Sequence, residues 1–139
     1  MNTDNLQTLL DSTDDFVFEE FRFDRFKGQL KCGTVGCLLG HYATISDDWE
    51  FTAKDEPKLK ESDNSFVTPL WDASDHFDLS VDLTELIFCP LEDCDDEFVQ
   101  ETYQRYIDEG IVLLGADASK EEVVSNVQHL IENPHIANL

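Results

Sequence analysis

The chain has 139 residues, and its 31 Asp and Glu against 9 Lys and Arg give a formal net charge of −22. A negative charge of this size argues against nucleic acid or an anionic membrane as a partner and favours a basic protein surface. The 10 Phe, 3 Tyr and 2 Trp argue against disorder, because disordered acidic segments contain few aromatic residues. One acidic globular domain over residues 1–139 is therefore expected.

The N-terminal segment has neither the basic nor the apolar region of a signal peptide. No run of residues approaches the roughly 18 apolar residues of a membrane span. A cytoplasmic protein is therefore expected. In that compartment the 4 Cys would be reduced thiols or metal ligands rather than a disulfide framework.

Helical spacing is clear at the start of the chain and is lost soon after it. Leu6, Leu9 and Leu10 recur at i, i+3 and i+4 and predict a short amphipathic helix that ends near Asp14. Between positions 16 and 26, Phe occupies every second position in two short runs, and the pattern shifts by one residue between Phe18 and Phe21. This pattern fits a hairpin or an irregular extended segment as well as a helical turn.

The middle of the chain is predicted to form a helix followed by a loop. The helix covers Val35 to Ile45, with Thr34 as its N-cap because a hydroxyl there can accept a hydrogen bond from a free amide of the first turn. Residues 46–66 are polar and contain Pro57, so we expect a loop that could hold a short hairpin around Trp49 and Phe51.

The second half of the chain carries clearer helix boundaries. Thr68-Pro69 predicts a helix start, Ser80 caps a helix that Pro90 ends, and Asp95 or Asp96 begins a longer helix that stops at Gly110. Ser119 and Glu122 form a capping box before the last helix, which Asn133-Pro134 ends. The expected fold is mainly α, with α+β possible. It is a compact single domain of about five or six short helices, with at most a small hairpin in residues 16–31 or 46–66.

The segment Cys32-Gly33-Thr34-Val35-Gly36-Cys37-Leu38-Leu39-Gly40-His41-Tyr42-Ala43 is the most motif-like part of the chain. It resembles a pattern of small uncharacterised phage and bacterial proteins, Cys-Gly-Thr-x-x-Cys-x-x-Gly followed by His or Trp and often Ala. Leu79-Ser80, Thr84 and Leu86-Ile87-Phe88 are similar to an element that follows in such proteins. The family has no settled function, so the resemblance implies a compact helical domain of phage-like origin and no catalytic role. Tyr42 departs from the pattern by shifting Ala one place.

The same segment supports two physical interpretations. Gly36 and Gly40 would share one helix face and allow another element to approach closely. Cys37 and His41, four residues apart, could face a metal ion together. The metal candidates are Cys32, Cys37, His41, Cys89 and Cys94. The Cys-x4-Cys spacing differs from the Cys-x2-Cys of structural zinc sites, so buried structural thiols and no cofactor are the main expectation.

No catalytic constellation is convincing. A Cys–His pair could be drawn from Cys37 and His41 or from Cys32 and His76, but acidic surroundings would raise the pKa of the thiol rather than lower it. Carboxylates are too numerous to single out a pair. Phosphate-binding and dinucleotide-binding motifs are absent, so we do not expect an enzyme.

The acidic residues are concentrated in one stretch. Residues 61–104 contain 13 Asp or Glu and no Lys or Arg. If residues 69–88 are helical, the acidic row (Asp72, Asp75, Asp78, Asp82 and Glu85) shares one broad side, with neighbours roughly 5 to 6 Å apart. Successive phosphates of one DNA strand rise by about 3.4 Å along the axis, so such a row could stand in for a nucleic-acid backbone.

The alternative is that these carboxylates form only the solvated faces of amphipathic helices and have no binding role. Ordinary helix faces mix charges of both signs, however, and this stretch does not. The sequence therefore favours a partner-binding surface, with two aromatic side chains as candidate anchors. Its predicted residues are Asp72, Asp75, Asp78, Asp82, Glu85, Asp93, Asp95, Asp96, Glu97, Trp71 and Phe98.

The functional hypothesis is a phage-type inhibitor or decoy in the cytoplasm of a host cell. Its acidic face would mimic a nucleic-acid backbone and block a basic, nucleic-acid-binding host protein such as a CRISPR effector or a restriction enzyme. The partner is a protein, and neither nucleic acid nor a membrane is bound directly. The alternative is a small metal-stabilised accessory domain whose acidity is only solubilising. The sequence leaves the oligomeric state open.

Overall fold

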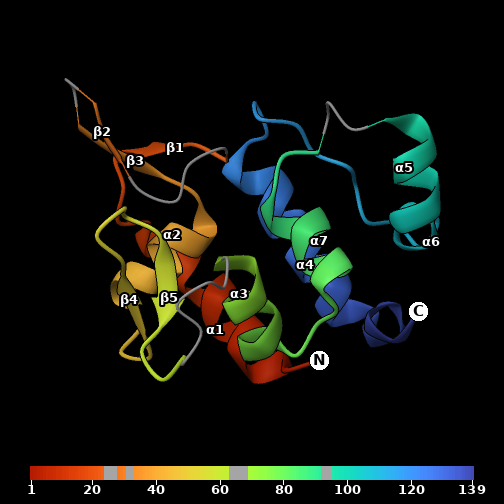
Figure 1. Ribbon diagram of the computed structural model, residues 1–139, viewed down its shortest axis with the longest axis horizontal. Helices are drawn as coiled ribbons and strands as arrows, with labels where there is room; N and C mark the ends of the chain where they lie inside the picture. Colours follow the sequence, from red (N-terminus) through yellow and green to blue (C-terminus); the bar gives the residue numbers. More distant parts are fainter. Residues whose placement is uncertain (24–27, 31–32, 63–68, 92–94) are drawn as a thin grey trace.

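The computed structural model describes residues 1–23, 28–30, 33–62, 69–91 and 95–139, and the fold of these residues is mainly α-helical, as predicted (Figure 1). The helices are α1 (Thr3–Ser12), α2 (Leu38–Ile45), α3 (Pro69–Phe77), α4 (Val81–Phe88), α5 (Asp96–Thr102), α6 (Gln104–Ile107) and α7 (Lys120–Glu132). Short 3-10 turns, Thr13–Asp15 and Pro134–Asn138, follow α1 and α7. The strands are β1 (Glu20–Phe21), β2 (Gly28–Leu30), β3 (Gly33–Gly36), β4 (Trp49–Phe51) and β5 (Pro57–Leu59).

Several helices begin where their capping residues predict. The Ser80 hydroxyl accepts a hydrogen bond from the Leu83 amide at 3.2 Å, which starts α4. At α7 the capping box is complete, because Ser119 accepts from the Glu122 amide at 3.2 Å and Glu122 accepts from the Ser119 amide at 3.1 Å. Each such cap contributes about 1 kcal/mol to helix stability. Local chemistry therefore sets these helix starts.

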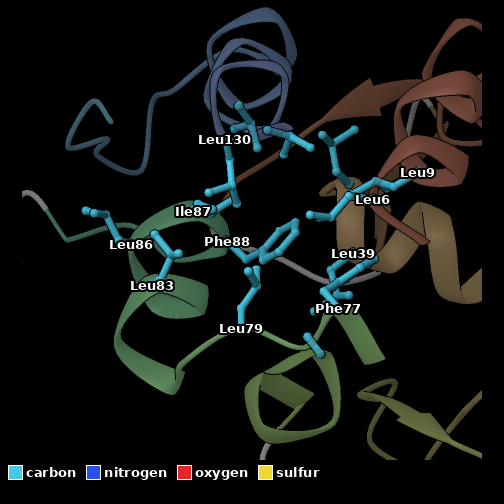
Figure 2. Close-up of a cluster of buried hydrophobic side chains, with 14 of the residues drawn as sticks. Leu6, Leu9, Leu39, Phe77, Leu79, Leu83, Leu86, Ile87, Phe88 and Leu130 are labelled. Carbon is cyan, nitrogen blue, oxygen red and sulfur yellow. The ribbon is translucent and has the colours of Figure 1, made fainter. Parts of the chain in front are cut away.

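A single hydrophobic core joins α1, α3, α4 and α7. Leu6 and Leu9 of α1, Phe88 of α4 and Leu130 of α7 converge on it (Figure 2). The rings of Phe77 and Phe88 stack with their centroids 5.7 Å apart, which ties α3 to α4. Burial of each such side chain contributes about 1.5–3 kcal/mol. The two small sheets and the α5–α6 pair lie toward opposite ends of this core (Figure 1).

The strands form two small sheets. In the first, β3 lies between β1 and β2 and pairs in parallel with β1 and antiparallel with β2. In the second, β4 and β5 form an antiparallel hairpin in which Trp49 opposes Leu59, as expected for residues 46–66. This hairpin contacts both α2 and α3. Strand β3 lies outside the two segments in which strands were expected.

The predicted start of the second helix is wrong. Thr34 and Val35 belong to β3, and α2 begins only at Leu38. Pairing of β3 with strands on both sides overrides the local helix-start signal, and β-branched residues fit such a strand well. Gly36 and Gly40 therefore do not share a helix face, and Cys37 precedes α2.

The helix predicted from Asp95 or Asp96 to Gly110 is interrupted. It starts as expected, with Asp95 as N-cap, but the backbone leaves helical geometry at Tyr103, between α5 and α6. The Tyr103 ring is buried and its hydroxyl donates to Glu85 of α4 at 2.7 Å. Tertiary contact with α4 thus decides the break, which the periodicity of the sequence does not reveal.

Gly110 ends this segment as predicted, with a left-handed φ of 106°. A Cβ atom at this position would lie 2.5 Å from Nε2 of His129, whose ring contacts the backbone here. Replacing Gly110 with Ala should therefore cost about 1–3 kcal/mol of folding free energy, measured by urea denaturation. Gly115→Ala is the matched control, because the φ of Gly115 is not left-handed. Equal unfolding midpoints for the two variants would contradict this expectation.

Candidate functional site

Asp72 is buried, although it was predicted to lie in an exposed acidic row. Its side chain is 3% exposed. One carboxylate oxygen accepts from the Leu59 amide at 2.9 Å and the other from the Ser62 hydroxyl at 3.0 Å. Asp72 therefore attaches α3 to the β4–β5 hairpin, and the prediction that it lies in an exposed acidic row is wrong.

The acidic residues of α4 face α5 and α6. Asp82 pairs with Arg105 at 3.5 Å, and Glu85 accepts the hydrogen bond from Tyr103. Arg105 also lies over the Tyr106 ring at 4.5 Å from its centroid. Asp82 and Glu85 are half-buried, and their carboxylates serve contacts within the fold.

The acidic row is interrupted as well. Asp78 has a left-handed φ of 51°, which ends α3, and α4 starts only at Val81. The Asp78 carboxylate lies 3.0 Å from the amino group of Met1, and its side chain is 80% exposed. Of the five residues of the row, Asp75 and Asp78 remain exposed. A continuous track of carboxylates at the spacing of a nucleic-acid backbone is therefore absent from α3 and α4.

A second acidic surface, the α5 patch, consists of Asp95, Asp96, Glu97, Phe98 and Glu101. All five side chains are exposed, and the Phe98 ring is 48% exposed while its edge packs on Tyr103 at 5.7 Å between centroids. Asp95 also accepts from the Glu97 amide at 2.8 Å, which caps α5. Asp93 lies outside the described residues. The α5 patch keeps the combination of carboxylates with an aromatic ring that the sequence predicted.

The structure adds an acidic cleft that sequence reasoning missed. The cleft has a volume of about 560 Å³ and lies between the β4–β5 hairpin, the turn before it and α3. It is lined by Asp47, Asp48, Leu59, Lys60, Glu61, Ser62, Asp72, Asp75 and His76. Asp47, Asp48 and Glu61 are far from α3 in the sequence, so only the docking of the hairpin on α3 brings these carboxylates to Asp75.

His76 forms the inner wall of the acidic cleft. Its Nε2 atom lies 2.8 Å from the Tyr42 hydroxyl, and the rings of Tyr42, Trp49 and Phe77 surround its imidazole. Burial lowers the pKa of His76, while the nearby Asp48 carboxylate raises it to a smaller extent. The imidazole is therefore neutral at pH 7, and the cleft stays negatively charged.

Metal binding by Cys37 and His41 together is contradicted by the contacts of the imidazole. His41 is fully buried, Nδ1 accepts from the Val17 amide at 3.1 Å, and Nε2 lies 3.0 Å from the Ser12 carbonyl oxygen. Both nitrogens are thus occupied, so His41 can act neither as a metal ligand nor as a base for the Cys37 thiol.

The cysteines give no metal site within the described residues. Burial, with smaller effects of Glu85 and Cys37, raises the pKa of the Cys89 thiol to about 12, which opposes the thiolate that a metal needs. Cys32 and Cys94 lie outside the described residues. In the part of the chain that the structure describes, no three His, Cys, Asp or Glu are grouped to hold a metal ion. The metal-stabilised alternative stays a prediction, which a zinc determination would test.

A comparison of the chain with protein-family models, with curated proteins and with solved structures found no match in any of the three. The resemblance to small phage and bacterial proteins therefore stays a prediction. Among the described residues, no helix is both long enough and apolar enough to cross a membrane.

Removal of the Asp72 carboxylate tests its role in the fold. Asp72→Ala leaves the Leu59 amide and the Ser62 hydroxyl without their acceptor, so it should destabilise the protein by about 1–3 kcal/mol in urea denaturation. Asp75→Ala, on the exposed side of the same helix, should change the stability by no more than about 0.5 kcal/mol. If both variants behave alike, Asp72 does not hold the hairpin.

The buried His41 and the half-buried His76 predict a loss of stability in mild acid. Burial lowers the pKa of His41 below the usual 6.5. The hydrogen bond to Ser12 and the charge of Asp15 oppose this shift, and the charge of Lys120 adds to it. Burial also lowers the pKa of His76. The unfolded chain takes up these protons near pH 6.5 and the folded chain only at lower pH. The stabilising contribution is thus complete above pH 6.5 and declines as the pH falls from there towards the folded-state pKa values.

Imidazole NMR titration combined with denaturation between about pH 7 and about pH 5 measures this effect. An imidazole of His41 or His76 that titrates at or above pH 6.5 in the folded protein would contradict the expectation.

Proposed function

We propose that this protein is an inhibitor that binds the basic, nucleic-acid-binding surface of another protein and excludes nucleic acid from it. The observation that carries this proposal is the coincidence of exposed carboxylates with exposed aromatic rings in two places. Trp71 is 56% exposed on α3, the helix whose Asp75 lines the acidic cleft, and Phe98 is 48% exposed in the α5 patch. Exposed aromatic side chains of this kind are typical of energetic hot spots in protein interfaces.

Charge supplies the specificity for a basic partner. Carboxylates of the acidic cleft and the α5 patch would engage Lys and Arg side chains that otherwise hold phosphates. The long-range field of a chain with net charge −22 would steer the encounter and make association fast and sensitive to salt. Inhibition by this route is competitive, because the inhibitor and the nucleic acid need the same cations.

The structure changes the form that mimicry takes in this proposal. Asp72 and Glu85 accept hydrogen bonds within the fold and Asp82 pairs with Arg105, so regular phosphate-like spacing along α3 and α4 does not support it. Support comes instead from the density of exposed carboxylates around two aromatic anchors. A partner would meet these as separate contact points, since the hairpin and α5 lie toward opposite ends of the molecule (Figure 1).

The resemblance of the Cys32–Ala43 segment supports a phage origin, and with it action in the cytoplasm of a bacterial host. A CRISPR effector, a restriction enzyme or another DNA-processing protein of the host is the proposed class of target. Each of these carries a basic channel that holds a nucleic-acid backbone, which is the surface that this acidic protein fits.

A displacement experiment tests the proposal. Host proteins retained by the immobilised protein at low salt are identified, and one that binds DNA is loaded with labelled DNA. The inhibitor should release this DNA at about 0.05 M salt, and its affinity for the DNA-free protein should weaken about tenfold or more when the salt concentration rises to about 0.2 M. Failure to displace DNA from any retained protein would overturn the proposed function.

Charge reversal gives the matched variants for this experiment. Reversing Asp75 and Glu97 to Lys should weaken displacement by about tenfold, because each lost contact also becomes a repulsion. Asp117→Lys with Glu132→Lys makes the same change in net charge at exposed positions outside both surfaces and should weaken it much less. Equal effects of the two pairs would show that net charge alone governs binding.

A further inference from the structure

Helix α3 exposes a face that no other described element covers. Its inner side packs on α1, α4 and β5 and buries Ala73 and Phe77. Trp71 lies on the outer side and is 56% exposed, whereas the second indole of the chain, Trp49, is buried at 2% exposed. A helix face that presents a large aromatic ring to water at this exposure is a candidate docking surface.

The Trp71 face adjoins the acidic cleft. Asp75 lies one helical turn after Trp71, about 6 Å along the axis, and it also lines the cleft. On a helical wheel Asp75 falls between Trp71 and the side that carries Asp72 and His76 toward the hairpin. Asp75 therefore lies between the face that carries the indole and the lining of the cleft.

The charge of this surface selects a cationic occupant. Asp47, Asp48, Glu61 and Asp75 are exposed carboxylates of the cleft lining, and Lys60 is the one Lys or Arg among its described residues. Asp72 is used by Leu59 and Ser62, and the neutral His76 adds no positive charge. The exposed lining thus carries four carboxylates against one ammonium group, and a cation that enters the cleft would offset part of this excess negative charge.

We propose that the Trp71 face and the adjoining acidic cleft form the docking site for an arginine side chain of a basic partner protein. The planar guanidinium group stacks on the exposed indole, and its N–H groups donate to the Asp75 carboxylate one helical turn away, while the other exposed carboxylates of the cleft, Glu61 among them, add electrostatic attraction. Lysine fits less well, because its ammonium group does not stack and donates to carboxylates as a point charge. The cleft volume of about 560 Å³ accommodates such a side chain. The identity of the partner as a nucleic-acid-binding protein rests on the proposed function.

Short synthetic peptides and tryptophan fluorescence test this site on the intact protein. An oligo-arginine peptide should perturb the emission of the exposed Trp71 and bind more tightly than an oligo-lysine peptide of equal length. Trp71→Ala should weaken oligo-arginine binding by about fivefold or more, measured by calorimetry, and Trp71→Phe should recover part of the loss. Val112→Ala, which trims an equally exposed apolar side chain outside both surfaces, should leave the affinity unchanged.

Neutral substitutions separate the site from general attraction. Asp75→Asn with Glu61→Gln should weaken oligo-arginine binding several-fold more than Asp117→Asn with Glu132→Gln, although both pairs remove the same charge from exposed positions. Equal weakening by the two pairs, or unchanged binding by Trp71→Ala with native circular dichroism, overturns the docking site.

The outcomes also separate this inference from the proposed function. If oligo-arginine binding depends on Trp71 but no nucleic-acid-binding protein releases DNA, the docking site stands and the proposed function fails. If DNA is displaced equally well by the wild-type protein and by Trp71→Ala, the proposed function stands and the docking site is overturned.

Discussion

Apolar packing where α1, α3, α4 and α7 meet has to hold this molecule together against a net charge of −22. Leu6, Phe77, Ile87 and Leu130 are fully buried there, and each such burial contributes about 1.5–3 kcal/mol. Exposed ion pairs such as Lys58 with Glu50 offset little of the repulsion, because they contribute about 0–1 kcal/mol each. The core residues carry no charge, so their burial stabilises the fold without adding to the repulsion between the surface carboxylates.

Buried polar side chains then fix the segments that the apolar core leaves undetermined. Asp72 holds the β4–β5 hairpin against α3, and His41 holds the chain after α1 through Ser12 and Val17. Asn126 of α7 bonds both the amide and the carbonyl of Val112 at 2.9 Å. Such contacts are costly to lose, because an unpaired buried polar group retains its full desolvation penalty. The acidic cleft owes its shape to the first of them.

The carboxylates of the chain fall into two groups that its composition cannot separate. Some hold contacts within the fold, as Glu85 does toward Tyr103, and others are exposed on helices that also expose an aromatic ring, as Asp75 is on the helix of Trp71. The exposed group comes from separate short elements, and the continuous acidic row expected along residues 69–88 is therefore not formed.

Local chemistry by itself determined the helix starts at Ser80 and Ser119, the stop at Gly110 and the acidic character of the protein. Capping and backbone preferences are settled within about one turn, so they can be predicted from neighbouring residues. Tertiary structure alone decided that residues 34 and 35 form a strand, that the helix breaks at residue 103, and which carboxylates stay exposed. Strand pairing, ring burial and hydrogen-bond partners for these positions come from segments distant in the chain, and a helical period cannot encode them.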